Sequence, residues 1–318
     1  MNELKKIFKK QGGIKLIYNY IRNGTLLHAI FLFFFLGKTK RDLEILRLSI
    51  QSKNQKKLSK KYMKVLQEFD TKYDYNLEHN SSNKIWICWF QGIENAPEIV
   101  KTCYQSIKAN MPNKEIVLIT RENLETYVQF PEYIIEKWKK GIITNTHMTD
   151  LLRLELLIKY GGMWLDATVL CTKKINDIPE YYFKSDLFLY QCLKPGKDGH
   201  ALFISSWFIS AKSNNKVLVA TRDLCYEYWK KHNYMVDYFL LHHFLCIVLE
   251  FYKTDWKNII PVSNSTPHIL LLQLFEKYDE NKWRYISDTI PFHKLSYKFS
   301  DQEFSKKNTY YQKIILKK

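Results

Sequence analysis

Residues 149–169 read TDLLRLELLIKYGGMWLDATV and contain an amphipathic helix pattern before a Gly-Gly pair. Thr149 or Thr146 can cap this helix, which places Asp150 in its first turn, where a carboxylate suits the positive end of the helix dipole. Arg153 lies three residues further on and therefore shares a face with Asp150. Leucines cover the remaining surface broadly enough for the helix to dock on a sheet.

A glycine pair, a short strand and a single aspartate follow this helix. Gly161 and Gly162 supply the positive φ that commonly ends a helix. Residues 163–165 (MWL) then form an apolar run that is typical of a buried strand, although it is too short to show periodicity. Asp166 stands at the C-terminal end of that strand, and open α/β sheets bind their ligands outside such strand ends. Asp166 is therefore the first candidate for chemistry.

Each of these polar residues also has a plain structural explanation. A polar side chain that opens a surface turn accounts for Asp166 as well as a chemical role does, since short motifs are weakly specific. Capping of the helix N-terminus explains Asp150 alone better than ligand binding does. An ion pair with Asp150 or Glu155 is the simplest account of Arg153. Spacing alone leaves these alternatives open.

Strand and helix patterns alternate along the rest of the chain. The order strand, helix, strand, helix, strand predicts a mainly parallel α/β sheet with right-handed crossovers. The sequence contains no Walker loop and no Gly-x-Gly-x-x-Gly loop, so a nucleotide phosphate would have to be held by a metal ion and side chains. Strands are expected at 85–90, 115–120, 163–165, 187–191 and 203–210, and helices at 96–108, 122–128, 131–139, 214–231, 236–252 and 267–278.

Composition favours a globular chain without disulfides. Hydrophobic residues make up 46% of the 318 positions, which is enough for a substantial core and argues against wholesale disorder. The six cysteines form no Cys-x-x-Cys pair, and several lie in apolar runs, as buried thiols do. This pattern indicates a reducing compartment, with neither disulfides nor a structural zinc site.

Positive charge is concentrated in the first quarter of the chain. The net charge is +17, and residues 1–80 hold 17 Lys or Arg against 7 Asp or Glu. Such asymmetry suggests a basic arm that faces a polyanion, and because no nucleic-acid-binding module is present, a membrane surface is favoured over nucleic acid. The run at 26–36 (LLHAIFLFFFL) has about half of the roughly 20 residues that a spanning helix needs. We favour a monotopic anchor, and a helix that simply packs on the body stays open.

Three stretches besides residues 149–169 complete a resemblance to a known family. They are 84–97 (KIWICWFQGIENAP), 236–244 (VDYFLLHHF) and 264–268 (NSTPH). Together with the Thr-Asp-x-x-Arg helix, the Tyr-Gly-Gly break and the strand that ends in an aspartate, they resemble the capsular polysaccharide synthesis proteins, relatives of glycosyltransferase family 32. The resemblance covers residues 84–295, and four motifs in order are far more specific than any one of them.

The resemblance implies an α/β fold with a GT-A-like, Rossmann-type nucleotide-sugar transferase domain that uses Mn²⁺ or Mg²⁺. Asp166 resembles the family's catalytic, metal-binding aspartate, and a C-terminal histidine, His268, would return to the metal. Asp237 and His242 would share a helix face, so Asp237 could orient donor or acceptor hydroxyl groups and either residue could act as a base on the acceptor, but a core or interface histidine in an apolar helix is the favoured account of His242. The motifs imply a donor site made of Trp89, Gln91, Gly92, Asp150, Arg153, Gly161, Gly162, Asp166, Ala167 and Thr168.

One position departs from the family's Asp-x-Asp pattern. The third residue is Thr168, so the motif reads Asp-Ala-Thr and supplies one carboxylate instead of two. A hard carboxylate oxygen on Asp166 suits Mg²⁺ or Mn²⁺, but a single carboxylate is too few, so the substrate's diphosphate and His268 would have to complete the shell. The way in which a metal ion would be held is therefore open.

The leading hypothesis is a retaining glycosyltransferase on the cytoplasmic face of the plasma membrane, with a nucleotide-sugar donor and a lipid-linked oligosaccharide of a capsular or surface polysaccharide as acceptor. A basic helical extension at 1–80 would bring a catalytic domain at 81–300 to the anionic membrane, and 301–318 would form a basic tail. A sugar-phosphate transferase of surface polysaccharide synthesis and an inactive membrane-associated scaffold are the alternatives. The nucleotide product separates the two enzymes, and failure to bind any nucleotide sugar favours the scaffold.

Overall fold

A five-stranded mixed sheet forms the centre of the fold in the computed structural model, which describes residues 13–193 and 201–318. Across the sheet the order is β2 (Glu115–Ile119), β1 (Lys84–Cys88), β3 (Gly162–Leu165), β6 (Ile204–Ala211) and β5 (Leu187–Gln191). β1 pairs in parallel with β2 and β3, whereas β6 runs antiparallel to both β3 and β5. β5 therefore runs in the same direction as β1, β2 and β3, so the expectation of a mainly parallel sheet is right for four strands and wrong for β6 alone among these five.

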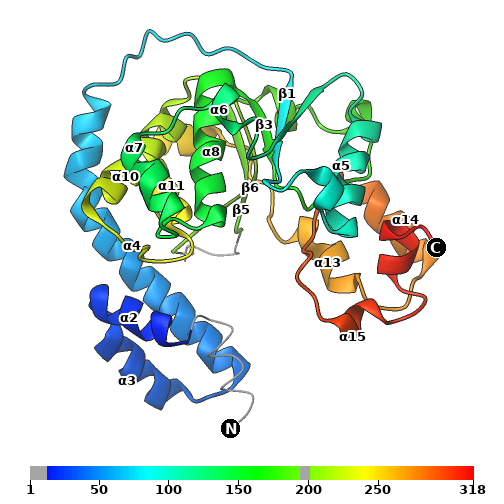
Figure 1. Ribbon diagram of the computed structural model, residues 1–318, viewed down its shortest axis with the longest axis horizontal. Coiled ribbons are helices and arrows are strands. Elements are labelled where there is room, and N and C mark those ends of the chain that lie inside the picture. Colours follow the sequence, from blue (N-terminus) through cyan, green and yellow to red (C-terminus); the bar gives the residue numbers. More distant parts are fainter. Residues whose placement is uncertain (1–12, 194–200) are drawn as a thin grey trace.

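Helices cover both faces of this sheet (Figure 1). One face carries α6 (Leu124–Tyr127), α7 (Glu132–Lys139), α8 (Asn145–Tyr160), α10 (Lys216–Lys231) and α11 (Leu240–Phe251), and the other carries α5 (Glu98–Asn110) and α9 (Tyr181–Lys184). Successive residues of β1 point to opposite faces. Trp86 therefore packs in the larger core with α8 and α10, while Ile85 and Ile87 pack in a second core with Ile107 of α5.

The helix that precedes β3 begins earlier than the sequence suggested. Thr144 caps α8 by accepting a hydrogen bond from the backbone N–H of His147 at 3.2 Å, so the prediction that Thr146 or Thr149 caps the helix is wrong. Asp150 consequently lies beyond the first turn, and the prediction that it serves the helix dipole is also wrong. Its carboxylate instead makes buried contacts with other side chains.

The Gly-Gly pair after α8 is required by the close approach of neighbouring chains. Gly161 has a φ of 65° and Gly162 a φ of 96°, which confirms the expected positive-φ end of the helix. A Cβ atom on Gly162 would lie 2.4 Å from the carbonyl oxygen of Lys84 in β1, and one on Gly161 would lie 2.8 Å from the backbone nitrogen of Ser213. Only glycine at these positions lets β3 pair closely with its neighbours.

Three helices build the N-terminal part of the described chain: α2 (Ile14–Arg22), α3 (Leu26–Leu36) and α4 (Lys40–Asp70). The C-terminal half of α4 packs in the main core through Leu58, Tyr62 and Leu66, while α3 packs against its N-terminal half (Figure 1). Among the described residues, no helix is long and apolar enough to cross a membrane. Residues 1–12 of the basic extension predicted at 1–80 lie outside the described residues, and the proposed domain limits at 80 and 300 stay predictions.

A two-stranded sheet and several short helices complete the fold beside α5. β4 (Val169–Cys171) follows the turn at Asp166 and pairs antiparallel with β7 (Phe292–Lys294). Tyr310 and Ile315, near the C-terminus, pack in one cluster with Ile99 of α5. The remaining short elements are Ile93–Asn95, Ile175–Asp177, α12 (Lys253–Asn258), Thr266–His268, α13 (Ile269–Gln273), α14 (Glu280–Thr289), α15 (Asp301–Phe304) and Tyr311–Ile315.

Two helices predicted in the C-terminal half are shorter than expected. α11 begins at Leu240 rather than at residue 236, so Asp237 lies in the preceding loop, where its Oδ1 accepts a hydrogen bond from the backbone N–H of Phe239 at 3.0 Å. Asp237 and His242 therefore do not share a helix face, and the geometric argument that paired them is wrong. The helix expected at 267–278 divides into a 3-10 turn and α13.

Candidate active site

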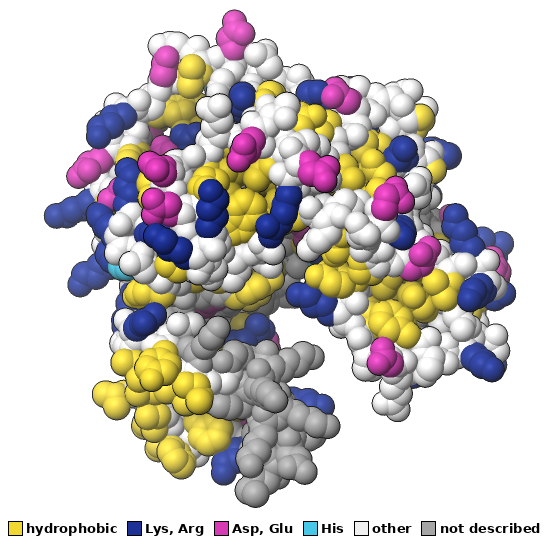
Figure 2. All heavy atoms as spheres, in the orientation of Figure 1, with side chains coloured by type: hydrophobic (Ala, Val, Ile, Leu, Met, Phe, Trp, Pro, Cys, Tyr) yellow, Lys and Arg dark blue, Asp and Glu magenta, His cyan; other side chains and the backbone are white. Residues whose placement is uncertain are grey.

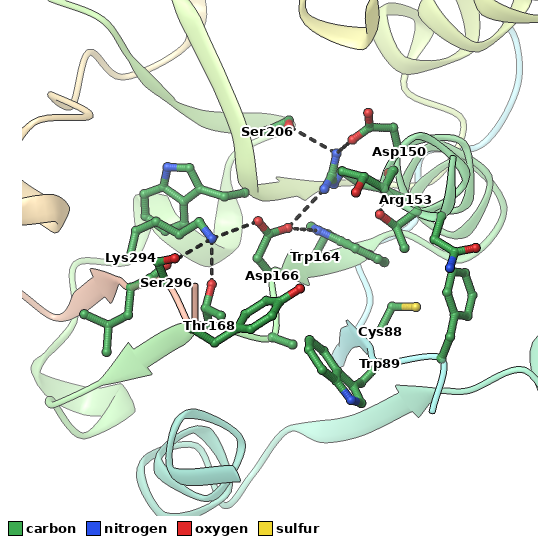
Figure 3. Close-up of a pocket in the computed structure, with 18 of the residues that line it drawn as sticks. Cys88, Trp89, Asp150, Arg153, Trp164, Asp166, Thr168, Ser206, Lys294 and Ser296 are labelled. Carbon is green, nitrogen blue, oxygen red and sulfur yellow. Dashed lines mark hydrogen bonds and ion pairs between the residues drawn. The ribbon is translucent and has the colours of Figure 1, made fainter. Parts of the chain in front are cut away.

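A cavity of about 720 Å³ opens at the carboxyl ends of β1 and β3 (Figure 3). This is the edge at which open α/β sheets bind their ligands, because the loops after neighbouring parallel strands meet there. The loops at 88–91 and 166–168 supply two of its walls. Of the residues predicted from the sequence, the structure brings together in this cavity Trp89, Gln91, Asp150, Arg153, Asp166, Ala167, Thr168 and His242.

Five other predicted residues are not among the described residues that line this cavity. Gly161 and Gly162 lie at the opposite end of β3, where they permit chain packing. Gly92 has a φ of 77° and open space around the position of a Cβ atom. His268 directs its Nδ1 atom to the carbonyl oxygen of Asn264 at 2.7 Å. Asp237 lines a different cavity, between the loop before α11 and the N-terminal helices.

Arg153 connects the two aspartates of the site. Its Nη1 donates to Oδ1 of Asp150 at 2.5 Å and to Oγ of Ser206 at 3.1 Å, and its Nη2 donates to Oδ1 of Asp166 at 3.0 Å (Figure 3). The guanidinium also lies over the Trp164 ring, 4.8 Å from its centroid. The ion pair with Asp150 that the sequence suggested is thus confirmed, and the same arginine additionally binds the residue at the end of β3.

Asp150 is buried and ionised. Nδ1 of His147 lies 3.3 Å from its Oδ2, and Nε2 of the same histidine accepts a hydrogen bond from Nε1 of Trp229 at 2.9 Å. The tryptophan therefore fixes the tautomer in which the Nδ1–H of His147 donates to the carboxylate. Burial alone would raise the pKa of Asp150, but Arg153 and His147 outweigh burial and hold the pKa below its ordinary value.

Asp166 is held by three side chains. Its Oδ1 accepts hydrogen bonds from Nη2 of Arg153 and from Nε1 of Trp164 at 3.1 Å, and its Oδ2 lies 3.1 Å from Nζ of Lys294. Burial would raise the pKa of Asp166, but the charges of Lys294 and Arg153 outweigh burial, so the pKa is lowered and the carboxylate is charged at neutral pH. This fixed anion faces the cavity.

Lys294 is the principal site residue that sequence reasoning missed. Its Nζ donates to Oγ1 of Thr168 at 2.6 Å, in addition to the contact with Asp166. The pairing of β4 with β7 sets this position, because Val169 faces Lys294 in the ladder and the N–H of Leu295 donates to the carbonyl oxygen of Thr168 at 2.9 Å. No motif near Lys294 in the sequence could have predicted this contact, because 126 residues separate the lysine from Thr168.

Ser206 of β6 was also missed, although a signal for it exists. Its hydroxyl accepts a hydrogen bond from Arg153 and lies 3.2 Å from Nε2 of His242. Ser205 and Ser206 interrupt an otherwise apolar run, and hydroxyl groups buried in a strand need hydrogen-bond partners. Two adjacent serines in a buried strand are therefore a usable pointer to a polar site.

The chain belongs to the capsular polysaccharide synthesis protein family, which matches residues 39–314. This match confirms the resemblance seen in the sequence. It extends beyond the motifs at 84–295 and includes all of α4 as well as Tyr310 of the C-terminal cluster.

Two curated relatives are described as O-glycosyltransferases. O-glycosyltransferase braB of Annulohypoxylon truncatum is 27% identical over 166 residues, and O-glycosyltransferase PaGT of Phomopsis amygdali is 26% identical over 165 residues. Each match covers 47% of this chain and 38% or 39% of the relative, so the chain matches less than half the length of these proteins. The solved structure of PaToxG Glycosyltransferase aligns with a TM-score of 0.38 and 17% identity, over 85% of this chain and 97% of that chain.

Proposed function

We propose that this protein is a glycosyltransferase that moves a sugar from a nucleotide-diphosphate sugar to a hydroxyl group of an acceptor. The observation that carries the proposal is the buried bridge of Arg153 between Asp150 and Asp166 at the cavity. Carboxylates fixed in this way are charged acceptors for sugar hydroxyl groups, and a neighbouring cation suits a phosphate. Membership of the family and the similarity to two O-glycosyltransferases support the same conclusion.

The proposed reaction exchanges one bond at the anomeric carbon of the sugar for another. The bond from this carbon to the β-phosphate oxygen breaks, and its electron pair leaves with the nucleoside diphosphate. The acceptor oxygen forms the new bond and gives up its proton. Because negative charge grows on the leaving diphosphate, fixed positive charge at the cavity lowers the barrier.

We favour His242 as the group that takes the acceptor proton. Its Nδ1 atom is buried and has no hydrogen-bond partner among the described residues. Burial lowers the pKa of His242 to about 4, so the imidazole is neutral at pH 7, and a pKa this low also makes it a weak base. Asp237 stays the second candidate from the sequence, although its carboxylate faces His243 at 3.5 Å, outside the cavity.

The fold subtype and the stereochemical outcome are further parts of the proposal, and both come from the family resemblance. We propose a GT-A-like arrangement and retention of the anomeric configuration. Nuclear magnetic resonance of the product formed from an α-linked donor tests the second point. An α-linked product supports retention, and a β-linked product refutes it.

The nucleotide that is released tests the reaction itself. The protein is incubated with a panel of nucleotide sugars, with water or an added sugar as acceptor, and the released nucleotide is identified by ion-exchange chromatography. Release of a nucleoside diphosphate, absent in Asp166→Asn, supports the proposal. Release of a nucleoside monophosphate instead identifies a sugar-phosphate transferase. Failure to bind or turn over any donor favours the inactive scaffold.

We also propose that the acceptor is lipid-linked and that α3 brings the protein to the inner face of an anionic plasma membrane. Leu27, Phe34 and Phe35 are 82%, 75% and 74% exposed. Figure 2 shows hydrophobic side chains gathered over α2 and α3, at the lower end of the molecule. Exposed Lys38 and Arg41 follow this apolar face. Apolar patches with basic flanks are typical of interfacial helices.

A further inference from the structure

The side chains around Asp166 do not fit the divalent cation that the family resemblance implies. Oδ1 of Asp166 accepts hydrogen bonds from Arg153 and Trp164, and Oδ2 faces Lys294. Residues 13–193 and 201–318 contain no group of three His, Cys, Asp or Glu side chains that could hold a metal ion. Mg²⁺ and Mn²⁺ need several oxygen ligands, and two cations already contact the carboxylate that would supply the first of them.

Lys294 occupies the position between the first and third residues of the Asp-Ala-Thr motif. Its Nζ lies 3.1 Å from Oδ2 of Asp166 and 2.6 Å from Oγ1 of Thr168 (Figure 3). Two chain-pairing contacts, Val169 opposite Lys294 and the Leu295 N–H to Thr168, fix the backbone from which the side chain extends. Backbone pairing therefore fixes the position of Lys294 relative to the motif.

The hydrogen bond from Lys294 explains why Thr168 can stand where the family pattern has an aspartate. A hydroxyl group accepts a hydrogen bond from an ammonium group without adding a second negative charge. With an aspartate at this position, two carboxylates would contact Lys294, and the three groups would carry a net negative charge that repels a phosphate. With Thr168, the pair of Lys294 and Asp166 carries no net negative charge, and Lys298, which also lines the cavity, adds positive charge.

We propose that the ammonium group of Lys294 takes the place of a divalent cation and binds the diphosphate of the donor. This inference rests on the proposed function, because it assigns the group that holds the leaving diphosphate. Asp166 and Thr168 each accept one N–H of the ammonium. The third N–H makes only a long contact of 3.5 Å with the carbonyl oxygen of Leu295, which a phosphate oxygen can replace.

The role of Lys294 during transfer is electrostatic. The electron pair of the broken bond stays on the β-phosphate oxygen, which gains negative charge. The ammonium group of Lys294 stabilises that charge from a fixed position, as oriented cations do in other phosphate sites. Asp166 is then a positioning residue that holds Lys294 and Arg153 in place, and no metal ion is needed for the step.

Calorimetric titration of the full chain with uridine, guanosine, cytidine and adenosine diphosphates tests this inference. Each titration is made in excess chelator and again in excess Mn²⁺. We expect the affinity for the preferred diphosphate to differ by less than about twofold between the two buffers. Lys294→Met is expected to weaken binding by about tenfold or more in chelator, and Lys294→Arg to keep it within about fivefold, since arginine preserves the charge.

Lys173 provides a matched control. Its side chain is 27% exposed, against 19% for Lys294, and it pairs with Asp288 at 4.0 Å, outside the cavity. Lys173→Met should therefore bind as the wild type does. If Lys294→Met fails to fold, the buffer comparison on the wild type and the Lys294→Arg variant still decide the question.

Two results would overturn the inference while leaving the proposed function in place. One is binding by the wild type that requires Mn²⁺ and disappears in chelator. The other is a folded Lys294→Met variant that binds the diphosphate as tightly as the wild type in chelator. Absence of binding to all four diphosphates in both buffers would overturn the proposed function together with the inference.

Discussion

Nη2 of Arg153 lies 3.0 Å from Oδ1 of Asp166, which ties the helix before β3 to the turn after it. The same guanidinium holds Asp150 through Nη1. One buried cation thereby fixes two carboxylates that come from different elements. The balance of charges in this network determines the stability of the fold and the affinity of the site for a ligand. Both quantities can be measured.

Removal of the charge on Arg153 should destabilise the fold strongly. Arg153→Met leaves Asp150 without its closest counter-charge in a buried position, and we expect the free energy of unfolding to fall by about 3–5 kcal/mol. Urea denaturation measures the change. The double variant Arg153→Met with Asp150→Asn should lose less than the sum of the two single variants, because the buried charge is removed with its partner. Strict additivity would contradict the network.

Protonation of His242 should make the protein less stable in mild acid. Burial lowers the folded-state pKa of His242 to about 4, from an ordinary value of 6.5. As the pH falls, the unfolded chain binds this proton first, so the contribution is fully present above pH 6.5 and is lost between 6.5 and about 4, by up to about 3 kcal/mol. His242→Gln should remove this part of the pH dependence. Identical pH profiles for variant and wild type would refute the assignment.

Alanine at the second glycine of the Gly-Gly pair should prevent close pairing of β3 with β1. A Cβ atom at Gly162 would meet the carbonyl oxygen of Lys84, and the φ of 96° is unfavourable for alanine as well. We expect Gly162→Ala to cost about 3 kcal/mol or more. Gly92→Ala is the matched control, because its φ is also positive but its surroundings are open, so a cost of about 1 kcal/mol is expected. Equal costs in urea denaturation would contradict the close-contact account.

Polar replacement on α3 should weaken membrane binding. The double variant Phe34→Ser with Phe35→Ser removes two highly exposed aromatic side chains, and we expect vesicle binding to fall by about tenfold or more. Sedimentation with phosphatidylcholine vesicles that contain phosphatidylglycerol measures this. Leu272→Ser, at a side chain that is 73% exposed elsewhere on the molecule, should leave binding unchanged. Wild-type binding by the double variant would refute a membrane role for α3.

The sequence predicted the centre of the site because the residues concerned lie close together along the chain. Asp150 and Arg153 lie three residues apart on one helix, and the Gly-Gly pair that ends this helix leads directly into the strand before Asp166. A helix period and two glycines are enough to place these groups near one another. The direction of β6 relative to β3 was not predictable in this way, because strand patterns do not encode strand direction.

The contacts that the sequence could not predict join segments that are distant along the chain. Lys294 reaches Asp166 only because β4 and β7 pair, and a three-residue strand carries little pattern. The sequence places Asp237 on a helix because 236–252 is mostly apolar, yet its carboxylate accepts the backbone N–H of Phe239 in the loop before α11. Short side-chain-to-backbone hydrogen bonds of this kind compete with the helical hydrogen bonds and commonly make a helix begin later than hydropathy suggests.

The central claim is that the cavity binds a nucleotide-sugar donor. Calorimetric titration of the wild type, Asp150→Asn and Asp237→Asn with a panel of nucleotide sugars tests it most directly. Asp150 is buried and Asp237 is partly buried, and each is paired with a histidine, but of the two only Asp150 lines the cavity. The account predicts that the wild type binds one donor, that Asp150→Asn weakens this binding by about tenfold or more, and that Asp237→Asn changes it by less than about twofold. A folded wild type that binds no donor, or donor binding that is lost in Asp237→Asn and kept in Asp150→Asn, would contradict it.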